Sequence, residues 1–123
     1  MACVFSQFPD VIECSATQLS NAFNAKEGET LTLSFSNNFI ITGKVISNLQ
    51  KYSNLQSMTI QLPAYANSVF HLSRQTNSDH STTFVGRILG TEALDGYEIR
   101  KDVTGNYKFQ KIEEGKIRQL CSH

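Results

Sequence analysis

The chain has 123 residues, of which 40% are hydrophobic and 18% charged, and its 11 basic residues balance its 11 acidic residues. This is the size of one domain that can bury its own core, and the balanced charge excludes the basic stripe that nucleic-acid binding requires. No apolar run approaches the ~20 residues of a membrane-spanning helix, so we expect no membrane span.

A capping signal marks the start of a single helix near the N-terminus. Ser15 and Gln18 have the spacing of a capping box, in which each side chain bonds a free backbone N–H of the first turn. Apolar residues at helical spacing follow, and Gly28 supplies a stop. We expect an amphipathic helix over about residues 15–26 that packs against a sheet.

From Glu29 onward the hydrophobic period changes to two, which is typical of half-buried strands. Turn formers separate the alternating segments, and Gly43 marks a bulge or a close backbone approach. Residues 48–57 are polar and predict a loop, and Gly105 is expected to have a positive φ in a turn. The seven predicted strands cover residues 30–35, 39–47, 58–62, 69–74, 84–89 and 97–101, and a last segment that starts at residue 107.

Seven short strands joined by turns predict a mainly β fold. We expect an antiparallel meander of about seven strands, curled into a barrel or sandwich, with one short N-terminal helix. Residues 1–14 are a lead-in segment, in which Val11 and Ile12 either form a short edge strand or lead into the helix. Residues 15–123 then form a single β-rich domain.

The three cysteines, Cys3, Cys14 and Cys121, leave two interpretations open. A disulfide between Cys14 and Cys121 would close a loop of about 100 residues, worth up to roughly 4.7 kcal/mol in the chain-entropy model. It would also require an oxidising compartment. The alternative is that all three cysteines are free thiols near the chain ends.

Two features bear on where the protein works. The first residues lack the basic region and apolar run of a signal peptide, so we expect either a cytoplasmic protein or a chain whose leader has been removed. The high content of serine, threonine and asparagine, with few charges, favours an exported protein. Of these alternatives we expect a secreted or periplasmic protein.

No set of residues in the sequence has the pattern of a catalytic site, and we expect the chain not to be an enzyme. The histidines His71, His80 and His123 share no motif with a serine or cysteine nucleophile. The metal-binding patterns HExxH and CxxC are absent, so we expect no metal and no cofactor. Glu98 lies on the opposite strand face from Tyr97 and is expected to face solvent or to pair with a cross-strand lysine or arginine.

Two tyrosines are candidate binding residues. Tyr97 and Tyr107 lie in neighbouring predicted strands, where their rings would form either an exposed stacking platform or part of the packed sheet. An exposed stacking platform would be a binding surface, whereas packing within the sheet would give the two tyrosines only a structural role.

The second half of the chain resembles a known family. The segments are SVFHLS from Ser68, FVGRI from Phe84, GYEI from Gly96, GNYKF from Gly105 and the stretch from Ile112 to Cys121. Over about residues 68–121 this order resembles the β-rich prodomain of secreted zinc metallopeptidases. The resemblance implies a domain that is not itself the enzyme. It also makes Cys121 the candidate residue for a thiolate that contacts the partner's zinc.

The leading hypothesis is therefore a non-enzymatic, exported β domain that binds another protein, as a propeptide-like or inhibitor-like module of a peptidase. The alternative is a small β-barrel whose phenylalanines line a cavity for an apolar or carbohydrate ligand. A third hypothesis, an enzyme, would require a cleft with two carboxylates or with His71 beside a carboxylate.

Overall fold

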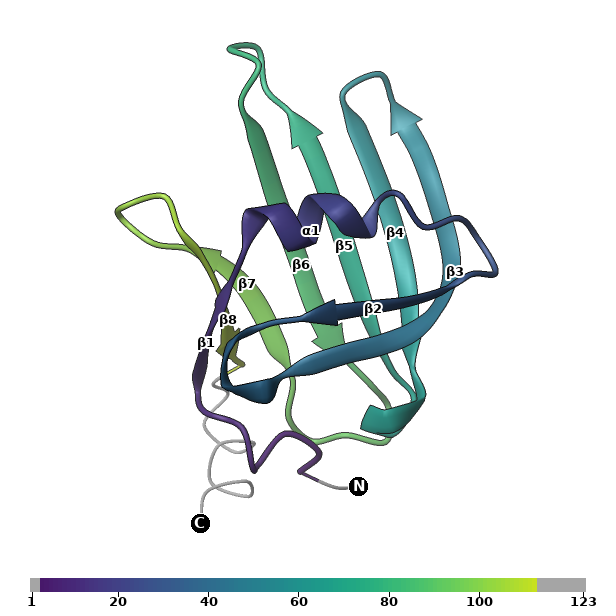
Figure 1. Ribbon diagram of the computed structural model, residues 1–123, viewed down its shortest axis with the longest axis vertical. Coiled ribbons are helices and arrows are strands. Elements are labelled where there is room, and N and C mark those ends of the chain that lie inside the picture. The colour runs from purple at the N-terminus through teal and green to yellow at the C-terminus, as the bar shows by residue number, and fades with distance from the viewer. Residues whose placement is uncertain (1–2, 113–123) are drawn as a thin grey trace.

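The computed structural model describes residues 3–112 and consists of one curled antiparallel sheet and one short helix (Figure 1). Along the sheet the strands follow the order β1-β8-β7-β6-β5-β4-β3-β2, so β1 pairs with β8 and every other pairing joins chain neighbours. The predicted mainly β meander is confirmed, with eight strands. They are β1 (Val11–Cys14), β2 (Thr30–Ser34), β3 (Ile40–Tyr52), β4 (Leu55–Leu62), β5 (Ser68–Thr76), β6 (Thr82–Leu89), β7 (Tyr97–Lys101) and β8 (Tyr107–Lys111).

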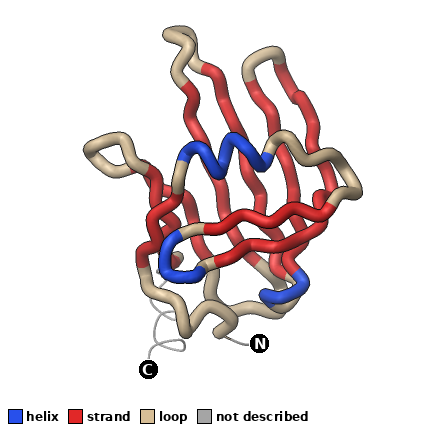
Figure 2. Tube along the Cα trace, in the orientation of Figure 1, coloured by secondary structure: helices blue, strands red, loops and turns tan. Residues whose placement is uncertain are grey.

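The sheet curls into a half-barrel that does not close. Its two edge strands are β1 and β2, and helix α1 (Ala16–Ala22) connects them. In Figures 1 and 2 the helix and β2 lie across the open side of the half-barrel, in front of the strands from β4 to β6. The concave face is therefore covered by α1 and β2.

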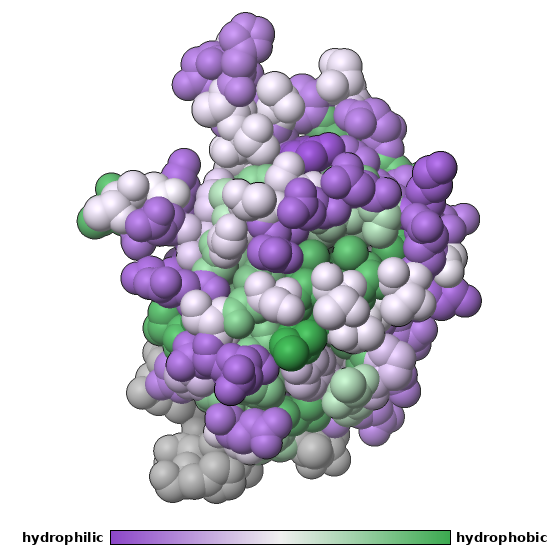
Figure 3. Space-filling view, in the orientation of Figure 1, coloured by the Kyte–Doolittle hydropathy of each residue, from purple (hydrophilic) through white to green (hydrophobic). Residues whose placement is uncertain are grey.

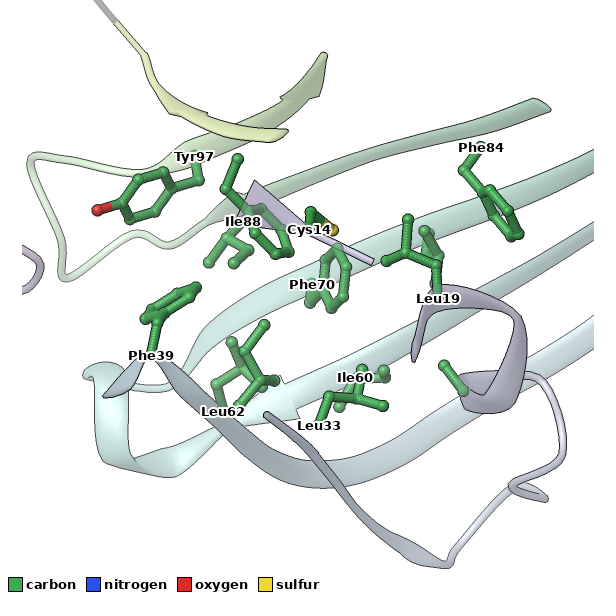
Figure 4. Packing of buried hydrophobic residues seen from close by; sticks show 14 of the residues in the cluster. Cys14, Leu19, Leu33, Phe39, Ile60, Leu62, Phe70, Phe84, Ile88 and Tyr97 are labelled. Carbon is green, nitrogen blue, oxygen red and sulfur yellow. The ribbon is translucent and has the colours of Figure 1, made fainter. Parts of the chain in front are cut away.

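The concave face and its cover form one hydrophobic core (Figure 4). Alternate residues of the strands point inward, as their period of two requires. Phe5, Leu19 and Phe23, from the N-terminal segment and the helix region, are also buried there. Aromatic rings meet edge to face in this core, for example Phe5 and Tyr97 with centroids 5.3 Å apart. The interior is thus filled by side chains.

Gly43 allows the backbone of β3 to approach that of β4 closely. A Cβ atom at this position would lie 2.2 Å from the backbone oxygen of Gln61, which is much closer than any van der Waals contact. Of the two predicted roles, close backbone approach is the one found. The predicted positive φ of Gly105 is also confirmed, at 90°.

The prediction of a loop over residues 48–57 is wrong, because β3 and β4 continue through most of this segment as a long hairpin. Its polar side chains bond to one another and to the end of the helix region. Gln56 Nε2 donates to Asn48 Oδ1 at 2.8 Å, and Asn48 Nδ2 donates to the carbonyls of Phe23 and Ala25 at 3.1 and 2.8 Å. Polar residues are satisfied here inside the sheet and do not indicate a loop.

Helix α1 is shorter than predicted. Its N-cap is Ser15, whose Oγ accepts from the N–H of Gln18 at 3.5 Å, as the capping signal predicted. The helix ends at Ala22, and Gly28 lies beyond it with a φ of 89°, in the turn before β2. Leu19 and Ala22 are buried, which confirms that the helix packs against the sheet.

Residues of the predicted lead-in segment belong to the sheet and the core, and of the two alternatives for Val11 and Ile12 the short edge strand is the one found. β1 pairs with β8 over four residues, and Phe5 is fully buried. The N–H groups of Val4 and Phe5 donate to the two carboxylate oxygens of Asp95 at 2.8 and 2.9 Å. The N-terminal segment is therefore anchored by the loop between β6 and β7, some 90 residues away.

Candidate functional site

A cleft of about 630 Å³ lies where β1, the start of α1, the end of β2 and the β7–β8 turn meet. This volume falls within the range of about 300–1,000 Å³ that is usual for ligand sites. Figure 3 shows apolar surface on this side of the molecule, below the polar residues that lie over α1. The cleft is lined by Glu13, Cys14, Ser15, Ala16, Ser34, Phe35, Ser36, Gly105, Asn106, Tyr107 and Lys108.

Cys14 points from β1 into the core at the inner side of the cleft, with 4% of its surface exposed. Burial raises the pKa of this thiol to about 12, so it stays protonated near neutral pH and is a poor nucleophile. It is a free thiol, so the predicted disulfide to Cys121 is wrong. Cys3 is disulfide-bonded, so the alternative of three free thiols is wrong as well. Cys121 itself lies outside the described residues.

Tyr107 forms part of the cleft wall but is largely buried, at 7% exposed. Its hydroxyl accepts from the N–H of Phe84 at 3.1 Å, and the two rings meet edge to face with centroids 5.6 Å apart. Tyr97 is fully buried, and its hydroxyl donates to the carbonyl of Pro9 at 2.7 Å. Burial, followed by the nearby Asp95 charge, raises the pKa of Tyr97.

The hypothesis of an exposed stacking platform is therefore wrong for both tyrosines, and the packing alternative holds. The curl of the sheet places their face of β7 and β8 on the inside, where the rings contact other aromatic side chains. Only Tyr107 remains a candidate contact residue, as part of the cleft.

The β7–β8 turn forms a well-ordered wall of the cleft. Asp102 Oδ1 accepts from the N–H groups of Thr104 and Asn106 at 2.9 and 3.0 Å, and from the hydroxyl of Thr104 at 2.6 Å. These hydrogen bonds, with that of the Thr104 hydroxyl the strongest, lower the pKa of Asp102 to about 2. The second oxygen of the carboxylate faces Lys108 Nζ at 3.5 Å, which places a cation at the cleft rim.

The cleft also lies between the outer edges of β1 and β2, which pair with no other strand within residues 3–112. Along β1, residues whose backbone N–H and C=O groups bond to β8 alternate with residues whose backbone groups point away from β8. The residues of β2 alternate in the same way relative to β3. Glu13 and Ser34 occupy such outward positions, and both line the cleft with exposed side chains. Backbone N–H and C=O groups are thus directed into the cleft from two sides.

The convex face carries a row of polar residues that crosses four strands. Glu98 is within 3.6 Å of Arg87 and 2.6 Å of Arg100, which confirms the predicted cross-strand pairing. His71 lies between Thr59, 3.4 Å away, and Arg87, its cross-strand neighbour. The cross-strand neighbour of this histidine on β6 is therefore a cation.

Neither metal ligands nor a membrane-spanning helix is found in the described part of the chain. Residues 3–112 contain no cluster of three or more His, Cys, Asp and Glu side chains that could hold an ion. None of their helices has both the length and the apolar character needed to cross a bilayer. His80 lies in the β5–β6 turn with a φ of 69°, and His123 lies outside the described residues.

Glu13, Ser34 and Lys108 are site residues that no sequence motif identified. The one signal in the sequence is the possible short edge strand at Val11 and Ile12. The sequence does not show that this strand pairs with β8, which brings the first and the last strand together. Comparison with known proteins finds no protein-family model, no curated protein and no solved structure that matches this chain.

Proposed function

We propose that this chain is a non-enzymatic, exported β domain that binds another protein through the cleft between β1 and β2. The observation that carries the proposal is an open, curled sheet in which the outer edges of β1 and β2 pair with no other described strand and lie on either side of a cleft. Free edges are the usual place where sheets accept a partner chain. Propeptide-like or inhibitor-like binding to a peptidase domain is the form of this function that the family resemblance favours.

Two further observations support the proposal. A disulfide at Cys3 agrees with an exported protein, since disulfides persist mainly in oxidising compartments. The described titratable groups of the cleft lining are Glu13, Cys14, Tyr107 and Lys108, and no histidine is among the lining residues. The lining therefore lacks a histidine base for its serines or for the protonated Cys14 thiol.

The alternative of a barrel that binds an apolar ligand has less support. A ligand inside the half-barrel would need the space that Phe5, Leu19 and Phe23 occupy. The cleft itself is lined largely by serines, Asn106 and charged residues, which suit a polar guest such as a peptide backbone.

Binding can be tested with the purified chain and a panel of catalytic domains from secreted zinc metallopeptidases. Isothermal titration and inhibition assays would be run on the wild type and on two arginine variants of exposed serines. Ser36→Arg places a long side chain in the cleft, whereas Ser53→Arg lies in the distant β3–β4 turn and is the matched control. We expect Ser36→Arg alone to weaken binding.

Absence of binding across the panel would contradict the peptidase-directed form of the proposal. Binding that Ser36→Arg leaves unchanged would instead contradict the placement of the site at the cleft. Saturable uptake of an oligosaccharide or a fatty acid, sensitive to Ser36→Arg and without any protein partner, would support the ligand-binding alternative.

A further inference from the structure

We infer that the cleft holds a short extended segment of the partner, clamped by the backbone groups of Glu13 on one side and Ser34 on the other. This inference rests on the proposed function and specifies how the partner is recognised. The segment would add a piece of strand between β1 and β2 and so complete the barrel at this point. Its main-chain hydrogen bonds would supply affinity, and its side chains would supply specificity.

The outward direction of the Glu13 backbone follows from the β1–β8 ladder. The N–H of Lys111 donates to the carbonyl of Asp10 at 2.8 Å, which makes that pair a hydrogen-bonded one. In an antiparallel ladder bonded and non-bonded pairs alternate, so Ile12 and Cys14 bond to β8, while Glu13 does not. The N–H and C=O of Glu13 therefore point away from β8.

The same argument applies to Ser34 in the β2–β3 ladder. The N–H of Val45 donates to Glu29 O and the N–H of Phe35 donates to Phe39 O, both at 2.9 Å. The backbone hydrogen bonds to β3 are thus made by the odd-numbered residues of β2. Ser34 lies opposite Ile40 as a pair without such hydrogen bonds. Its N–H and C=O point away from β3, toward the side on which the cleft lies.

These four backbone groups suit an extended chain better than a rounded small molecule. Each residue offers one donor and one acceptor in the spacing that a neighbouring strand uses. Neither β1 nor β2 contains a proline or lysine, two residues that commonly protect free strand edges. An unpaired edge of this kind is open to a guest strand.

The cleft lining indicates the side chains that the guest segment carries. Cys14, Phe35 and Tyr107 form its apolar inner part, so the guest residue that faces inward is apolar. The remaining walls come largely from small residues, which leave room for a backbone to approach. Glu13 and Lys108 lie on the rim with opposite charges, so the flanking guest residues are neutral and polar.

Two sets of reagents separate backbone clamping from side-chain contact. Glu13→Pro and Ser34→Pro remove one outward N–H each, without removing a ladder bond, and proline is tolerated at such edge positions. Glu13→Ala and Ser34→Ala are matched controls that keep the N–H and lose the side chain. The probes are the hexapeptide Thr-Val-Thr-Val-Thr-Val with blocked ends and the same peptide N-methylated at its central residues.

Binding of these peptides would be followed by NMR titration of the full chain. We expect the unmethylated hexapeptide to shift amide signals around the cleft, and each proline variant to bind it roughly tenfold more weakly. The alanine variants should bind almost as the wild type does, and the N-methylated peptide should not bind. Because the methylated peptide needs no protein variant, the test stands even if a proline variant fails to fold.

Three results would overturn the inference. The first is no binding of the hexapeptide, and the second is binding that the proline substitutions and N-methylation leave unchanged. The third is a dimer, seen by sedimentation, that Glu13→Pro dissociates, since the edge would then pair with a second copy of the chain. If a peptidase domain still binds both proline variants normally, the proposed function stands and only this mode of recognition falls.

Discussion

The carboxylate of Asp95 is expected to contribute a large part of the stability of this fold, and Asp95→Ala tests it. The side chain is 7% exposed and accepts two hydrogen bonds, from the N–H groups of Val4 and Phe5. Hydrogen bonds to a charged group contribute roughly 1.5–3 kcal/mol each, and the N–H of Phe5 would stay buried without a partner. We expect a loss of about 3 kcal/mol, out of the roughly 5–15 kcal/mol that is usual for a domain.

Urea unfolding followed by circular dichroism would measure this loss. Asp95→Asn keeps one acceptor oxygen and should lose about half as much, roughly 1.5 kcal/mol. Glu92→Ala, in the same loop but exposed, is the matched control and should change stability by less than about 0.5 kcal/mol. An Asp95→Ala protein as stable as the Glu92→Ala protein would refute the view that this carboxylate anchors the N-terminal segment.

Four other predictions concern Gly43, Cys14 and Asp102. Gly43→Ala should destabilise the protein by about 1–3 kcal/mol in the same urea assay, because the added methyl group meets the backbone oxygen of Gln61; an unchanged midpoint would contradict the close approach. The Cys14 thiol should resist iodoacetamide in the folded protein and react in urea, as mass spectrometry can show. Because burial raises the pKa of Cys14 from 9.0 to about 12, the stability that the buried, protonated thiol contributes is fully present below pH 9.0 and is lost as the pH rises from 9.0 through about 12. Cys14→Ser lacks the thiol, so an equal loss of stability over this pH range in that variant would contradict the prediction. Asp102 has a lowered pKa, so its contribution is present above its ordinary value of 3.8 and is lost as the pH falls through about 2; Asp102→Asn should remove this pH dependence from the unfolding curve.

Much of the local structure could be predicted because it depends on near neighbours in the chain. Alternation of apolar and polar residues identifies β2 and the first part of β3, since a strand has a period of two whatever it pairs with. The left-handed turn residues Asn37 and Asn38, with φ of 61° and 58°, follow from the tolerance of asparagine for that conformation. The N-cap at Ser15 likewise depends only on the next three residues.

The candidate site could not be predicted in the same way. The pairing of Ile12 with Phe109 brings together residues that no local pattern relates. That pairing, and the curl that buries Tyr97 and Tyr107, decide which tyrosines are exposed and where a cleft forms. The tyrosines are identical in local pattern to exposed strand residues, so their burial was open at the level of sequence.

What the sequence by itself determined is the mainly β class, most of the strands and the chemistry of the turns, because these depend on period and on local backbone preference. Only the tertiary structure decided that β1 completes the sheet beside β8 and that β1 and β2 remain apart. The physical reason is that a strand edge is defined by the absence of a neighbour, and a strand's own residues do not specify which neighbour the rest of the fold will supply.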